Sequence, residues 1–98
     1  MNMTISTAAL SKLKEWKRIH DKRHGYASVL GILWIDSSEN PGFPSVPAIG
    51  YYDPKDEIGA DIHVIGGLQI VFVVPERYRM KLEGKTLDVG SDGLFVHD

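Results

Sequence analysis

The last third of the chain constrains the fold most. It contains a buried strand, then a short helical turn that begins at a proline, then a hairpin marked by glycines. Residues 67–98 read GLQIVFVVPERYRMKLEGKTLDVGSDGLFVHD. Leu68–Val74 is apolar at nearly every position, which is typical of a central strand with both faces covered. Gly66-Gly67 predicts a tight hairpin turn before that strand, and Pro75 predicts the start of a helical turn after it.

A final hairpin and an N-terminal helix are predicted from equally local signals. Thr86–Val89 and Leu94–Val96 are predicted to form a final hairpin through the turn Gly90-Ser91-Asp92-Gly93. At the other end, apolar residues recur every three positions, which predicts a helix over residues 6–23 with one buried face. The members of this stripe are Leu10, Leu13, Trp16 and Ile19. Ser6 or Thr7 is suited to begin this helix and Gly25 to end it.

The middle of the chain predicts further strands around a proline-rich loop. Tyr26–Asp36 is rich in β-branched and aromatic residues, so a largely buried strand is expected. Three prolines between residues 41 and 47 exclude a helix or a central strand there. Ala48–Tyr52 and Asp61–Ile65 return to strand character. The order predicts one domain over residues 1–98, an α+β fold with an N-terminal helix packed on a mostly antiparallel, curled sheet.

Composition excludes several classes of function. The 98 residues contain no cysteine and carry a net charge of −2. Disulfides, thiol catalysis and thiolate metal ligation therefore have no residue to use. The N-terminus lacks the pattern of a signal peptide and no apolar run spans a bilayer, so we expect a cytoplasmic protein that binds neither membrane nor nucleic acid.

Candidate metal ligands are sparse. His20 and His24 lie four residues apart on the predicted helix, so both rings fall on one side and begin a metal site if a carboxylate joins them. Two exposed histidines at a helix end are the alternative. His63 is interpreted as a core or edge residue of a strand. The acidic residues Asp53, Asp56, Glu57 and Asp61 are interpreted as solvated loop carboxylates rather than a cation site, because their spacing does not match an EF-hand.

Catalytic motifs are not apparent, so the protein is expected not to be an enzyme; a small enzyme with an unrecognised site is the alternative. None of the serines lies in a nucleophile elbow, and Gly84-Lys85-Thr86 lacks the upstream glycine of a phosphate loop.

Two features favour protein partners or self-association. Phe43 within the proline-rich loop and Tyr51 and Tyr52 after it are expected to form an apolar contact surface for a partner or a second subunit. The alternative is that Phe43 folds back as a lid over the barrel. The charge is also uneven, because residues 1–25 carry a net +4 and the rest a net −6. The basic side chains Lys14, Lys17 and Arg18 on the predicted helix are therefore a second possible contact, with a solvated helix face as the alternative.

Several patterns, in order along nearly the whole chain, resemble the HesB/IscA family of A-type iron–sulfur carriers. Residues 3–9 (MTISTAA) are similar to the family's opening, and residues 67–73 (GLQIVFV) to a strand introduced by glycine. Residues 82–88 (LEGKTLD) are similar to its leucine–x–glycine–x–x–leucine–aspartate signature, and residues 93–95 (GLF) to its ending. The resemblance implies a HesB-like half-barrel, a homodimer and a link to iron–sulfur cluster biosynthesis.

The departures from the family pattern concern its ligands. The resemblance implies one cysteine after the first long strand, where this chain has Asp36-Ser37-Ser38-Glu39, and two more beyond the last strand, where the sequence ends at His97-Asp98. Ser37, Ser38 and His97 would therefore mark a vacated cluster site. Oxygen ligands hold an iron–sulfur cluster poorly. We therefore expect no cluster or other cofactor, and a degenerate, non-enzymatic member that acts as an accessory or interaction module.

Overall fold

The computed structural model describes residues 1–56 and 62–98. A two-residue strand, β1 (Thr4–Ile5), leads into the helix α1 (Thr7–His24). The Ser6 hydroxyl accepts a hydrogen bond from the N–H of Ala9 at 3.0 Å, which begins the helix. Gly25 ends it with φ of 74°, and its N–H donates to the carbonyl of Asp21. The predicted helix is confirmed to within one residue at each end.

The strands form two mixed sheets rather than one curled sheet. The four-stranded sheet has the order β3-β2-β5-β4, with β2 (Val29–Ile35), β3 (Val46–Tyr52), β4 (Ile62–Ile65) and β5 (Leu68–Phe72). The three-stranded sheet has the order β1-β6-β7, with β6 (Thr86–Gly90) and β7 (Gly93–His97). Between β5 and β6 the chain forms the 3₁₀ helix η1 (Glu76–Lys81).

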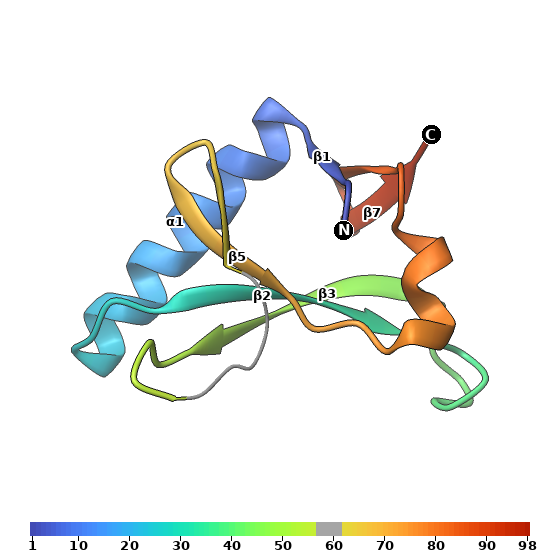
Figure 1. The fold of residues 1–98 in the computed structure, drawn as a ribbon, viewed down its shortest axis with the longest axis horizontal. Coiled ribbons are helices and arrows are strands. Elements are labelled where there is room, and N and C mark those ends of the chain that lie inside the picture. The colour runs from blue at the N-terminus through green and yellow to red at the C-terminus, as the bar shows by residue number, and fades with distance from the viewer. Residues whose placement is uncertain (57–61) are drawn as a thin grey trace.

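The predicted α+β class is confirmed. β2–β3, β4–β5 and β6–β7 pair antiparallel, whereas β2–β5 and β1–β6 pair parallel. The described strands do not close into a barrel. α1 lies along one side of the four-stranded sheet, and η1 lies at the far end of that sheet (Figure 1).

Local turn chemistry explains most of the connections. Gly66 and Gly67 have φ of 58° and 87°, so both residues adopt the left-handed conformation that the predicted β4–β5 turn needs. The predicted loop boundary at Pro47 is wrong, since β3 already begins at Val46 and Pro47 lies opposite Trp34. An edge strand accepts a proline because one side of its backbone has no strand neighbour.

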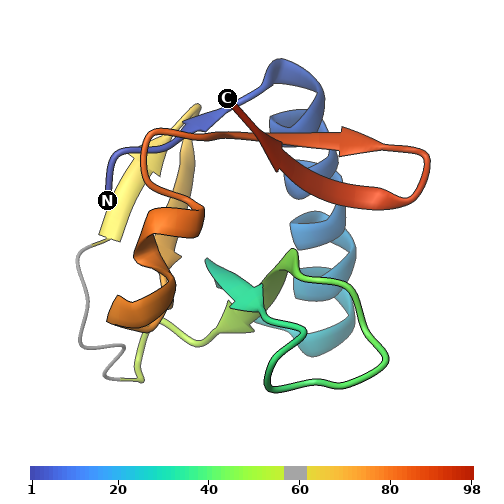
Figure 2. The same ribbon diagram turned by 90° about the vertical axis from the view of Figure 1, so that its right-hand side faces the viewer.

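One core joins the helix to both sheets. Leu13 of α1, Leu30 of β2 and Leu87 of β6 are fully buried in the same cluster. The other buried members are Met3, Ile32, Leu68, Ile70 and Leu82. The β6–β7 hairpin lies beside the N-terminal half of α1 (Figure 2), so the small sheet closes one end of this core.

The apolar stripe predicted on α1 drifts away from that core. A spacing of three residues falls short of a helical turn by about 60° at each step. Leu13 is therefore buried, Trp16 is partly buried and Ile19 is 37% exposed. His20, with only 17% of its side chain exposed, takes the inward position instead, which brings an imidazole into the space between α1 and β3.

Candidate functional site

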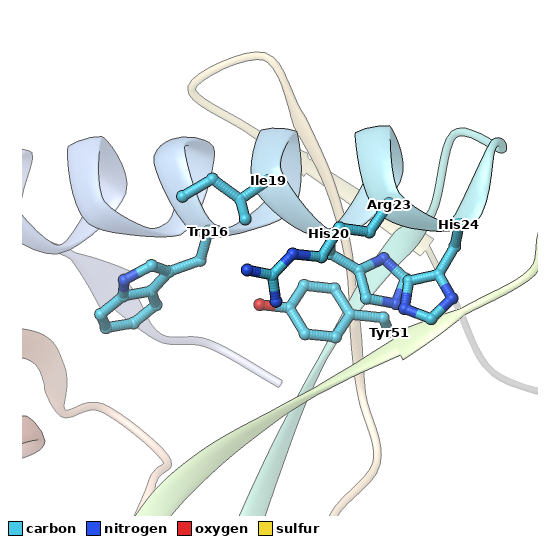
Figure 3. Close-up of a pocket in the computed structure, with 6 residues that line it drawn as sticks. All are labelled: Trp16, Ile19, His20, Arg23, His24 and Tyr51. Carbon is cyan, nitrogen blue, oxygen red and sulfur yellow. The ribbon is translucent and has the colours of Figure 1, made fainter.

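An open pocket of about 220 Å³ lies between the C-terminal half of α1 and β3 (Figure 3). Its lining residues are Trp16, Ile19, His20, Arg23, His24 and Tyr51. The helix contributes all but Tyr51, which comes from the edge strand. Side-chain alternation on β3 explains the direction of Tyr51, because it pairs with the core residue Leu30 and shares its face.

Three rings form a continuous stack along this pocket. The His20 ring lies face to face with Tyr51, with centroids 3.9 Å apart and planes 6° apart. Its other neighbour is His24, at 4.3 Å and 27°. Tyr26 approaches His20 edge-on at 5.8 Å. Contacts between stacked rings are favourable, so the stack stabilises this arrangement of the pocket wall.

Asp21 anchors the helix end beneath this stack. Its carboxylate accepts hydrogen bonds from Lys17 Nζ at 2.6 Å and from the Ser28 backbone N–H at 3.2 Å, and His20 Nδ1 lies 3.2 Å away. Burial acts to raise the pKa of Asp21, but the bonds from Lys17, Ser28 and His20 outweigh it and hold that pKa well below its usual range. Burial, and then the nearby Asp21 charge, raise the pKa of Tyr51.

The structure brings His20 and His24 together, as predicted from their spacing, but in a geometry that differs from metal ligation. A metal ion lies in the plane of each imidazole that binds it, whereas these two rings are stacked. Within residues 1–56 and 62–98, no group of three histidine, cysteine or acidic side chains is placed to hold a metal ion. Metal binding at this pair therefore needs at least one ring to rotate out of the stack.

Ser37 and Ser38 lie in a loop that is organised by Asp36. The Ser38 hydroxyl donates to Oδ2 of Asp36 at 2.5 Å, and the Trp34 indole N–H donates to Oδ1 at 2.9 Å. The hydrogen bond from the Ser38 hydroxyl, followed by that from Trp34, lowers the pKa of Asp36 to about 2. The Ser37 hydroxyl accepts from Ser45 at 3.0 Å. Both serine hydroxyls are therefore committed to the loop itself.

η1 holds the same loop from outside. Arg77 donates to Glu39 at 2.5 Å, and the Tyr78 hydroxyl lies 3.3 Å from that of Ser38. Tyr78 is thus half-buried against the loop, while Leu82 is fully buried.

His97 lies elsewhere, at the end of β7. Its Nε2 is 3.1 Å from Oδ2 of Asp88, whose Oδ1 accepts the Ser6 hydroxyl at 2.7 Å. The hydrogen bond to the Asp98 carbonyl, followed by that to Asp88, raises the pKa of His97. The pKa of Asp88 is lowered, mainly by the hydrogen bond from the Ser6 hydroxyl. Figures 1 and 2 both draw the loop after β2 and the C-terminal end of the chain well apart. The residues predicted to mark a vacated cluster site are therefore not adjacent within the chain.

The donor set of these residues does not fit an iron–sulfur cluster. The sequence supplies no thiolate, and the serine hydroxyls near the end of β2 already bond within their loop. The Asp36 carboxylate is likewise occupied, since the Ser38 N–H also bonds it at 3.2 Å. Hard oxygen ligands and a single distant imidazole do not replace the soft ligands that such clusters prefer.

The residues predicted as partner contacts occupy different surfaces. Phe43 is 67% exposed in the proline-rich loop. Tyr51 faces α1, whereas the Tyr52 ring lies over Gly31 on the opposite face of the sheet. Lys14 and Arg18 are exposed, but Lys17 is bound to Asp21.

The remaining candidates from the sequence are His63 and the acidic residues between positions 53 and 61. His63 faces the Phe72 ring edge-on at 5.4 Å, and Asp53 accepts the N–H of Lys55 at 2.9 Å. Glu57 and Asp61 of the acidic group, and the first residue of the predicted strand 61–65, lie outside the described residues. Among the helices of the described ranges, none has the length and apolarity that a bilayer crossing requires.

Sequence reasoning missed Trp16 and Arg23 as pocket residues and Asp36 as the centre of a loop. The role of Asp36 could have been predicted, because an aspartate just before two serines favours a turn that its side chain caps. The pocket had none, since it depends on which strand lies beside the helix end.

Comparison with known proteins identifies the fold. No model of a known protein family and no curated protein matches the sequence. Among solved structures, the fold is similar to a crystal structure of IscA with its 2Fe–2S cluster, at a TM-score of 0.58. The alignment covers 98% of this chain and 82% of that chain, with 18% sequence identity. The chain therefore has an IscA-like fold, and the resemblance inferred from sequence motifs is confirmed at that level.

Proposed function

We propose that this chain is a degenerate member of the HesB/IscA family, a non-enzymatic interaction module that does not hold an iron–sulfur cluster through its own side chains. The observation that carries the proposal is an IscA-like fold over 98% of a sequence with no cysteine. The loop that follows β2 supports it, because the Ser38 hydroxyl donates to Asp36 there and the Ser45 hydroxyl donates to that of Ser37.

The side chains most similar to a catalytic group also favour a non-enzymatic role. Ser6, Asp88 and His97 lie together, but the carboxylate stands between the hydroxyl and the imidazole. A general base must contact the hydroxyl that it activates. Ser6 also accepts the Ala9 N–H as the helix N-cap. This group therefore ties α1 to β6 and β7, which is a structural task.

A second copy of the chain is the partner that the exposed surface favours. Ile62 and Val64 of β4 are 47% and 70% exposed, on the sheet face opposite α1. Within the described residues, β4 pairs with β5 alone. An apolar edge strand with unpaired backbone groups is a site for strand pairing. Antiparallel pairing of β4 with its symmetry mate would join two sheets across a two-fold axis.

Val64→Lys tests this dimer by sedimentation velocity. We expect the wild-type chain to dimerise with a Kd on the order of 1 μM, about 8 kcal/mol. Because Val64 is 70% exposed, lysine there leaves the monomer core intact but places like charges face to face at the pairing edge, so dimerisation weakens at least about tenfold.

Met80→Lys is the matched control, since Met80 is 77% exposed and lies on η1, which is not a strand of the four-stranded sheet. It should dimerise like the wild type. A wild-type chain that remains monomeric at about 100 μM, or two lysine variants that behave alike, contradicts the β4 interface.

A further inference from the structure

The pocket between α1 and β3 has the composition of a small-molecule site. It is lined by the aromatic rings of Trp16 and Tyr51 and by two imidazoles, with His20 covering one face of Tyr51, and Arg23 supplies one fixed charge (Figure 3). Ligand sites are concave, mostly aromatic or apolar, and contain few polar groups. The volume of about 220 Å³ is below the usual range for drug-sized ligands, so it suits one ring with a small substituent.

The charge balance around the pocket favours an anion. Asp21, the carboxylate nearest the ring stack, is already bound by Lys17 and by the Ser28 N–H. Arg23, by contrast, has no carboxylate within 4.0 Å among the residues that the structure describes. In Figure 3 its guanidinium extends back along the helix, into the space between Trp16 and Tyr51. A planar guanidinium with free donors binds a carboxylate through two parallel hydrogen bonds.

We propose that this pocket binds a planar aromatic ring that carries a carboxylate. The ring packs against Trp16 and Tyr51, and the carboxylate pairs with Arg23. The stack of His20 and His24 on Tyr51 keeps the pocket wall in place before the ligand arrives, which lowers the ordering cost of binding. This site is independent of the β4 edge, because its residues lie on the sheet face toward α1.

Benzoate is the probe, and the two tryptophans provide an internal comparison. In two-dimensional NMR spectra of the isotope-labelled chain, benzoate should shift the indole N–H signal of Trp16. The Trp34 indole N–H, which donates to Asp36 outside the pocket, should not move. Benzamide, which keeps the ring without the charge, and cyclohexanecarboxylate, which keeps the charge without the flat ring, should each bind at least about fivefold more weakly.

Arg23→Gln and Arg18→Gln form a matched pair of variants. Both arginines are exposed on α1, so neither change disturbs the core, but only Arg23 lines the pocket. Arg23→Gln should weaken benzoate binding about fivefold or more, whereas Arg18→Gln should leave it unchanged. Absence of any Trp16 shift at about 10 mM benzoate overturns the proposal, as do equal affinities for benzoate and benzamide or for the two variants.

Discussion

Leu87→Ala is expected to lower the free energy of unfolding by about 3 kcal/mol. Leu87 is fully buried in the cluster that contains Leu13 of the helix and Leu30 of the large sheet. Alanine at this position loses buried apolar contacts and leaves a cavity where three elements meet. Urea unfolding followed by circular dichroism measures the change in midpoint and slope.

Phe95→Ala is the control on the same hairpin. Phe95 is 43% exposed, so its truncation should cost less than about 1 kcal/mol. If the two variants lose equal stability, or if Leu87→Ala has no effect, the small sheet does not share a core with α1 and the large sheet.

Asp21→Ala is expected to cost about 2 kcal/mol of stability. The carboxylate joins the helix end to the start of β2 by accepting from Lys17 and from the Ser28 N–H. Alanine leaves both donors without this acceptor and removes the carboxylate that lies beside His20 Nδ1. Asp21→Asn keeps an acceptor oxygen and should lose about half as much, as measured by urea unfolding.

The same carboxylate gives the expected pH dependence. Because the folded-state pKa of Asp21 lies below its ordinary value of 3.8, its contribution is complete above that pH. It is lost as the pH falls below 3.8 toward the folded-state pKa. Wild type and Asp21→Ala should therefore converge in stability in acid.

Glu15→Ala, which breaks an exposed pair with Lys12, should change stability by less than about 0.5 kcal/mol. An Asp21→Ala variant as stable as the wild type at neutral pH would contradict this role.

Local chemistry is what the sequence reveals well in this chain. Ser6 and Gly25 mark the ends of α1 because their preferences act within a few residues. Gly66-Gly67 marks its turn for the same reason, through positive φ angles. The motifs around Leu82 and Gly93 were sufficient to suggest the IscA-like fold that the structural comparison supports.

Long-range pairing is what the sequence does not reveal. The parallel contact of β2 with β5 joins residues forty positions apart, such as Leu30 and Ile70, so no local pattern encodes it. The split into two sheets depends on that contact and on the pairing of β1 with β6. The candidate pocket could not be predicted from the sequence for the same reason, because Tyr51 contacts His20 only when β3 lies beside α1.

Anaerobic reconstitution of the chain with iron, sulfide and a reductant tests the central claim most directly, when followed by gel filtration and visible absorption spectra. A cysteine-containing IscA protein treated in parallel shows that the procedure assembles clusters. The account predicts that this chain emerges with no more iron or visible absorption than a control protein without metal ligands, since its donor set is hard and already hydrogen-bonded. A cluster that remains bound at stoichiometric amounts after gel filtration would contradict it.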